Sequence, residues 1–168
     1  AGPGGFVSCV PRPVLAGGNA DANTFSDICH VGVANGSATV VGNTGPTEIA
    51  VMQFNLQTPM VAFDERTDGF EFVDGGFATA EAAVIDDQGI FVVGTANTRR
   101  NGGVLDANAS NPFVLSLDPS GVFVDYHQRG EANRVEFVAG VDKQERWLVL
   151  AGHTEGNLLE NNLGGFDV

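Results

Sequence analysis

The sequence predicts an all-β protein built from antiparallel four-stranded units, and three observations lead to this fold class. The 168 residues include 23 glycines and 12 phenylalanines, and only 17% are charged, which favours strands and tight turns over charged surface helices. Similar β-rich segments recur along the chain, with short connections between most of them. No run of ten residues shows the apolar periodicity of an amphipathic helix.

Three glycines mark the repeat: Gly42, Gly94 and Gly152. Each closes a β-rich run that follows an apolar strand end and a polar turn. The glycines lie roughly 50 to 60 residues apart, which is the length of one repeating supersecondary unit. The chain therefore reads as successive copies of one unit.

The middle copy shows the unit most completely. Its third strand is followed by Asp118-Pro119-Ser120-Gly121, a turn in which proline presets φ and Gly121 can adopt a positive φ. Residues 96–112, rich in Asn, Gly and Arg, form an insert between the second and third strands, as expected of a surface loop. The four predicted strands are Ala80–Ile85, Ile90–Gly94, Phe113–Leu117 and Val122–His127.

Four-stranded meanders with one apolar face cannot bury that face alone, so they stack, either radially as propeller blades or linearly. We predict a partial β-propeller of about two and a half blades. Since a ring needs about four blades or more, further blades of a longer chain or neighbouring copies are expected to complete it. The predicted boundaries are 1–18 for the last strand of a preceding blade, 19–69 and 70–130 for two blades, and 131–168 for an incomplete blade that ends at the start of its third strand, Gly164–Val168.

The middle unit resembles the bacterial-type β-propeller repeat family. The similarity rests on the segment Ala82–Thr95, with its Asp-x-x-Gly turn and aromatic-valine strand ending in Gly-Thr, and on Pro112–Gly121, with its Leu-Asp-Pro-Ser-Gly run. The first copy has Gln57-Thr58-Pro59 in place of Asp-Pro-Ser-Gly, and the third has a charged turn at 142–146. The resemblance implies a propeller architecture and an extracellular setting, and it supplies no catalytic motif.

Two short patterns bear on the compartment. Asn35-Gly36-Ser37 and Asn108-Ala109-Ser110 are acceptor sequences for N-glycosylation, so Asn35 and Asn108 are the predicted glycosylation sites. Cys9 and Cys29 are the predicted disulfide, and two buried thiols are the alternative left open. Together these features favour an extracellular or cell-surface glycoprotein. No run of about 18 apolar residues, as a membrane span requires, occurs in the sequence.

The charge balance and the spacing of reactive residues limit the possible functions. A net charge of −13 repels phosphate backbones and anionic lipid headgroups, so we expect neither nucleic acid nor membrane partners. His30, His127 and His153 lie in different strand classes of different units, which does not favour a metal site. Adjacent carboxylates such as Asp86-Asp87 point to opposite faces of a strand and fit turn chemistry better than acid/base catalysis. We therefore assign no catalytic, cofactor-binding or metal residue.

Three alternatives remain open at this point. The oxygen-rich connections with Asp68, Glu71 and Asp74, and with Asp106, Asn108 and Asn111, suit structural calcium. Arg99-Arg100 is either solvated or bound to a carboxylate. Trp147 is expected in the core, and stacking on a sugar ring is its alternative.

The predicted function is a secreted structural or adhesive propeller scaffold that needs no cofactor and contacts extracellular proteins or glycans. We do not predict an enzyme. Its other partners are further copies or blades of the same protein. The alternative is an extracellular carbohydrate-active enzyme of the propeller type, with its site in the rim loops.

Overall fold

A computed structural model describes residues 27–43, 49–57, 61–66, 77–97, 110–130 and 134–155, and for 61–66 it describes the backbone alone. Strands and turns make up these residues, which contain no helix and hence no helix long and apolar enough to cross a membrane. The strands are β1 (Asp27–Ala34), β2 (Ser37–Asn43), β3 (Ile49–Asn55), β4 (Val61–Arg66), β5 (Ala78–Ile85), β6 (Ile90–Ala96), β7 (Asn111–Leu117), β8 (Phe123–Gln128), β9 (Glu136–Gln144) and β10 (Trp147–Thr154).

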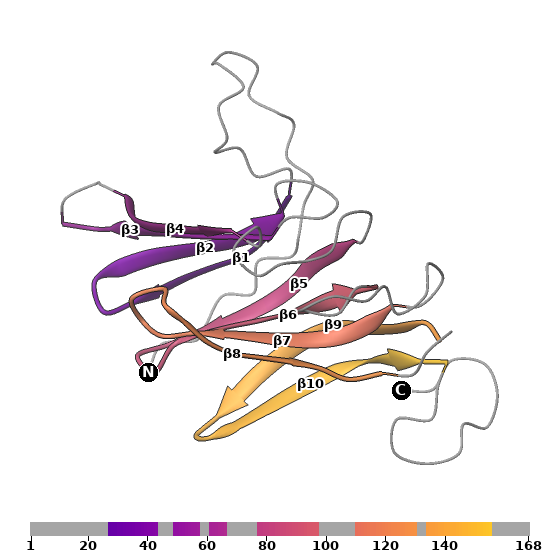
Figure 1. The fold of residues 1–168 in the computed structure, drawn as a ribbon. Coiled ribbons are helices and arrows are strands. Elements are labelled where there is room, and N and C mark those ends of the chain that lie inside the picture. The colour runs from indigo at the N-terminus through magenta and orange to yellow at the C-terminus, as the bar shows by residue number, and fades with distance from the viewer. Residues whose placement is uncertain are drawn as a thin grey trace, which may run out of the picture.

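The strands form antiparallel meanders, as the sequence predicts. β1 to β4 make one four-stranded sheet in chain order, β5 to β8 make a second, and β9 pairs with β10. We call these three groups unit 1, unit 2 and unit 3. Figure 1 shows them as successive layers, with unit 2 between the other two. The all-β, antiparallel part of the prediction is confirmed. Gly164–Val168, the predicted start of a further strand, lies outside the described residues.

The same bulge recurs in the first strand of every unit. Cys29 is the extra residue of β1, Glu81 that of β5 and Ala139 that of β9, because each is skipped in the register with the neighbouring strand. The bulges lie beside the three marker glycines, since Gly42 pairs with Ile28, Gly94 with Ala80 and Gly152 with Val138. A bulge increases the local twist of a strand pair, so the three units share one twist at one place. The bulges also define equivalent positions from unit to unit.

The bulge explains why the marker positions are glycine. A Cβ atom on Gly94 would overlap the carbonyl oxygen of Thr79 and lie 2.8 Å from the ring of Phe113. A Cβ on Gly152 would overlap the carbonyl oxygen of Phe137, which is the equivalent of Thr79. Close approach of two backbones leaves no room for a side chain, so glycine is required there.

One apolar core lies between the first two sheets. Unit 1 contributes Val41, Ile49 and Val51, which are almost fully buried. Unit 2 contributes buried side chains from β5, β6 and β7, namely Ala78, Ala80, Ala83, Ile90, Val92, Ala96, Phe113, Leu115 and Leu117. Burying these aliphatic and aromatic groups stabilises each by about 1.5–3 kcal/mol relative to exposure. The stacking of units 1 and 2 therefore rests on ordinary core packing.

The turns follow the predicted chemistry. The β1–β2 turn places Asn35 and Gly36 at φ 51° and 74°, as a tight hairpin turn requires. Asp118 Oδ1 accepts hydrogen bonds from the backbone N–H groups of Ser120 (2.8 Å) and Val122 (2.9 Å), and Gly121 has φ 87°. The Ser120 hydroxyl also donates to Asp118 Oδ1 (2.7 Å), and this hydrogen bond, together with those from the backbone, lowers the pKa of Asp118. The positive φ expected at Gly121 is confirmed.

Candidate functional site

Polar side chains join unit 1 to unit 2 at the bulge of β5. Asn43, buried at the end of β2, receives a hydrogen bond from the backbone N–H of Ala80 (2.8 Å) and donates one to the carbonyl oxygen of Ala80 (3.2 Å). Cys29 Sγ donates to the same carbonyl oxygen (2.7 Å). The backbone N–H and carbonyl groups of Ala80, next to the bulge, are thus both hydrogen-bonded by unit 1, as buried polar groups require.

A cation joins unit 2 to unit 3. Lys143 on β9, the single lysine of the sequence, bonds to the Asp86 carboxylate and donates a hydrogen bond to Gln88 Oε1 (2.8 Å). Its Nζ also lies 4.9 Å from the centroid of the Phe91 ring, a cation–π contact. The lysine side chain is 7% exposed, and its ammonium lies among three groups of unit 2: the Asp86 carboxylate, the Gln88 amide and the Phe91 ring.

The same contact sets the ionisation of Asp86. Burial alone raises the pKa of this carboxyl group, but the hydrogen bonds that it accepts from Lys143, Gln88 and Gly89 outweigh burial and lower the pKa. Asp86 Oδ1 binds the backbone N–H groups of Gln88 (2.9 Å) and Gly89 (3.1 Å). Asp86 is therefore a turn residue, as predicted, and in addition an inter-unit ion-pair partner, which the sequence did not indicate.

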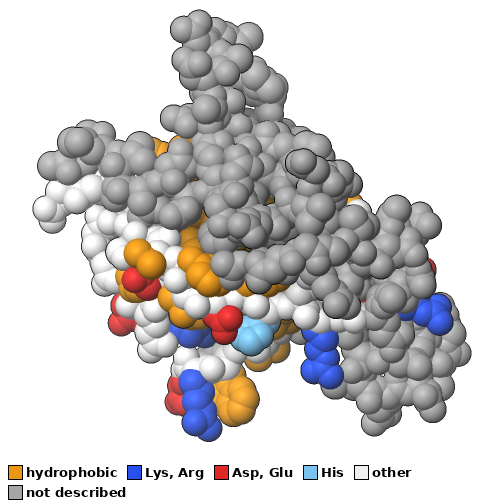
Figure 2. Space-filling view, in the orientation of Figure 1, with side chains coloured by type: hydrophobic (Ala, Val, Ile, Leu, Met, Phe, Trp, Pro, Cys, Tyr) orange, Lys and Arg blue, Asp and Glu red, His pale blue; other side chains and the backbone are white. Residues whose placement is uncertain are grey.

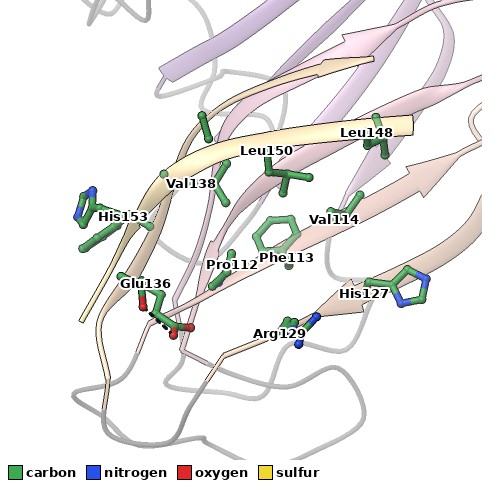
Figure 3. A pocket seen from close by; sticks show the side chains of 14 residues that line it. Pro112, Phe113, Val114, His127, Arg129, Glu136, Val138, Leu148, Leu150 and His153 are labelled. Carbon is green, nitrogen blue, oxygen red and sulfur yellow. Dashed lines mark hydrogen bonds between the residues drawn. The ribbon is translucent and has the colours of Figure 1, made fainter. Parts of the chain in front are cut away.

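A cleft of about 660 Å³ lies between units 2 and 3. Its walls are mainly apolar, with Pro112 and Val114 of β7 on one side and Val138, Leu148 and Leu150 of unit 3 on the other (Figure 3). Leu148 and Leu150 are the equivalents of Ile90 and Val92, which are buried in the core between units 1 and 2. The cleft is thus an inter-unit space of the same kind as that core, less completely filled.

The two histidines of the cleft do not converge on one point. His127 and His153 lie at opposite ends of the cleft in Figure 3, and both imidazoles point away from its middle. His127 Nε2 lies 2.9 Å from Asp125 Oδ2 on an exposed surface, and the ring of His153 lies 4.9 Å from that of Phe137. Glu136 is fully buried and accepts a hydrogen bond from Thr154 Oγ1 (3.1 Å). Its carboxylate is therefore held by a side chain of β10.

The predicted site residues fall partly within the described chain. Asn35 is exposed on the β1–β2 turn, where a glycosylation site is accessible. Asn108 and Cys9 lie outside the described residues, so glycosylation at Asn108 stays a prediction. Cys29 is buried with its thiol hydrogen-bonded to the Ala80 carbonyl oxygen and is not seen in a disulfide, so its pairing with Cys9 also stays a prediction.

The metal alternatives fall largely outside the described chain as well. Of the calcium candidates, Asn111 alone is described, and it is buried at the start of β7 and not in a loop. Among the described residues no three or more His, Cys, Asp or Glu side chains gather as metal ligands would.

The prediction that Trp147 lies in the core is wrong. The expected core residue is 63% exposed, on the side of β10 that faces away from the cleft. The guanidinium of Arg146 lies 5.1 Å from its ring centroid. At the tip of the β9–β10 hairpin, at the bottom of Figure 2, hydrophobic, cationic and acidic side chains lie together at the surface. The β-rich context of Trp147 predicted a strand correctly, but strand content does not tell which of its two faces is covered.

Sequence comparisons add no relative to this picture. No protein-family model matches the chain, and the search of curated proteins finds no significantly similar sequence.

Proposed function

We propose that this chain is a secreted structural or adhesive scaffold of blade-type units in a propeller arrangement, which binds an extended protein segment in the cleft between units 2 and 3. The observation that carries the proposal is the cleft itself, a space of about 660 Å³ with apolar walls beside the edge of β10. Among the described strands, β10 pairs with β9 alone. A strand edge of this kind can present backbone hydrogen-bonding groups to a partner.

Unit 2 supports the choice of an extended segment as the partner. There the strand equivalent to β10 is β6, which pairs along its whole length with β7. The side chains of β7 alternate between buried and half-buried positions, with Phe113, Leu115 and Leu117 in the core. A segment with the same alternation can add to the edge of β10, where main-chain hydrogen bonds supply affinity and alternate side chains enter the cleft.

The scaffold part of the proposal is supported by the repeated geometry. The same bulge, the same glycine and the same order of strands recur, and at each junction a side chain of one unit bonds to groups on its neighbour. Repeat proteins of this kind are stabilised by contacts between neighbouring units and present rigid surfaces for binding. Exposure of the Asn35 sequon on a turn supports an extracellular role.

The test uses a labelled peptide with the sequence of β7, Asn111–Leu117, carrying terminal lysines for solubility, as a stand-in for the segment. We expect saturable binding by fluorescence anisotropy, with a Kd of about 10–100 μM for so small a contact. Leu150→Asp, which places a carboxylate in the cleft, should weaken binding about tenfold or more. Val124→Asp is the matched control, since Val124 is an exposed β8 valine that does not line the cleft, and it should bind as the wild type does.

A parallel arm incubates the protein with neutral and uronic-acid oligosaccharides. Binding of oligosaccharides without peptide binding would replace the protein partner with a glycan. Release of shortened sugars would overturn the scaffold function in favour of a carbohydrate-active enzyme. Equal peptide binding by wild type and Leu150→Asp would remove the cleft from the proposal.

A further inference from the structure

The two outer faces of the stack carry exposed apolar side chains at positions that are covered inside it. Counting from the bulge, Val31 and Val33 of β1 are the equivalents of Ala83 and Ile85 of β5. In unit 2 these positions face the preceding unit, because Ile85 Cβ lies 2.9 Å from where a Cβ on Gly32 would stand, and Ala83 is buried. In unit 1 the same positions are 41% and 65% exposed. We call Val31 and Val33 the leading face.

The opposite end of the stack shows the complementary face. Phe91 of β6 points toward unit 3, since Lys143 lies over its ring. Its equivalent in unit 3 is Val149, which is 58% exposed. Trp147 lies two residues away on the same strand and hence on the same side of β10. We call Trp147 and Val149 the trailing face, which lies opposite the cleft-lining residues Leu148 and Leu150.

We propose that the leading face of one copy of this chain stacks on the trailing face of a second copy, so that the inter-unit contact continues from chain to chain. This inference rests on the scaffold function proposed above and names its partner. The interface is heterologous, because two different faces meet, and such contacts propagate into a closed ring or an open filament.

The contact that already occurs twice within the chain argues for a second copy as the occupant. At the contact between units 2 and 3, position 143 is a lysine that needs the Asp86 carboxylate and Gln88 as partners. Val33 holds the equivalent position on the leading face, so stacking at that face does not require a buried cation to find a partner. Clusters of β-branched and aromatic side chains at a surface are typical of interaction sites.

The net charge of the chain opposes the association and makes it depend on salt concentration. Two copies that each carry a net charge of −13 repel one another over a Debye length of about 10 Å at 0.1 M salt and about 3 Å at 1 M. An apolar contact strengthens when this repulsion is screened. Association should therefore increase with salt, whereas an interface held by ion pairs would weaken.

The experiment measures mass by sedimentation velocity over about 5–500 μM protein in 0.1 M and 1 M NaCl, a range that spans weak apolar contacts. The wild-type chain should rise above its monomer mass of 17.5 kDa with concentration, and more so at 1 M NaCl. Val33→Asp and Val149→Asp should each remain monomeric. Val124→Asp, at a similarly exposed valine on neither face, should associate as the wild type does.

Mixing the two variants separates this proposal from other modes of association. Val33→Asp keeps an intact trailing face and Val149→Asp an intact leading face, so an equimolar mixture should form a dimer of one of each and nothing larger. If either aspartate variant loses its far-UV circular dichroism, Val33→Thr and Val149→Thr replace the pair, since threonine nearly preserves the shape of valine.

A monomeric wild-type chain throughout the range would overturn the proposal, and so would continued self-association of Val33→Asp or the absence of a mixed dimer. Peptide binding in the cleft is read separately. A monomer that still binds the β7 peptide would therefore overturn head-to-tail stacking and leave the proposed function standing.

Discussion

Lys143→Met tests whether the ion pair between units 2 and 3 stabilises the stack. Methionine preserves much of the apolar stem of lysine and removes the ammonium, so the substitution leaves Asp86 without its cation while the packing changes little. Removing one partner of a buried pair costs about 3–5 kcal/mol, and an exposed pair is worth about 1 kcal/mol or less. Because the lysine is 7% and the aspartate 32% exposed, we expect a loss of about 2 kcal/mol.

The assay is urea unfolding at pH 7, followed by far-UV circular dichroism, for the wild type, Lys143→Met, Asp86→Asn and the double variant. The double-mutant cycle should give a coupling free energy of about 1–2 kcal/mol. Arg146→Met is the matched control, because Arg146 is an exposed cation on the same hairpin, and its cost should stay below about 0.5 kcal/mol.

The same pair predicts a pH dependence. The pKa of Asp86 is lowered in the folded protein, so its contribution is present above the ordinary aspartate pKa of about 3.8 and is lost as pH falls through the lower folded value. The difference between wild type and Lys143→Met should therefore be constant from about pH 5 to 8 and shrink below about pH 4. A coupling below about 0.3 kcal/mol at pH 7, or a difference that persists unchanged into acid, would refute the reasoning.

Four further predictions concern single positions. Gly94→Ala should lose about 2–4 kcal/mol in urea unfolding because its Cβ overlaps the Thr79 carbonyl, whereas Gly140→Ala, with open space around its Cβ, should change stability by less than about 1 kcal/mol. Burial lowers the pKa of His30, so protonation destabilises the fold as pH drops below about 6.5; the thermal midpoint of His30→Leu should fall less than that of wild type between pH 7.5 and 5.5. Glu145 has φ 54°, which favours glycine, and Glu145→Gly should raise the free energy of unfolding by about 0.5 kcal/mol; a lower value would contradict strain there. Secreted from eukaryotic cells behind a leader peptide, Asn35→Gln should lose one glycan by gel shift after glycosidase treatment relative to wild type, and equal shifts would show that the Asn35 sequon is unused.

The β-strands and their order were predictable from the sequence because the signals are local. Strand-forming runs bounded by turn residues place β5 to β8 to within about two residues, as is usual for element ends. Gly121 at a positive φ and Asp86 in a turn follow from residue chemistry within three or four positions. The glycine markers were visible as a repeat, although their cause, a backbone carbonyl against the Cα atom, was not.

The functional surfaces could not be read from the sequence, because they depend on which face of a strand another unit covers. Side chains alternate between the two faces of β10, and both faces carry apolar residues in the sequence. Only the stacking of units decides that Leu148 and Leu150 line a cleft and that Trp147 is exposed. Lys143 lies in the charged run 142–146 beside a turn, and no neighbouring residue in the sequence indicates that it is buried.

The sequence by itself thus determined an antiparallel all-β chain with a repeating unit, an acidic charge and an exposed sequon turn at Asn35. Only the tertiary structure decided the repeated bulge, the pairing of Asn43 with Ala80 and of Lys143 with Asp86, and the cleft beside β10. The physical reason is distance along the chain: turns and strands arise from neighbours a few residues apart, whereas these contacts join residues 37 and 57 positions apart.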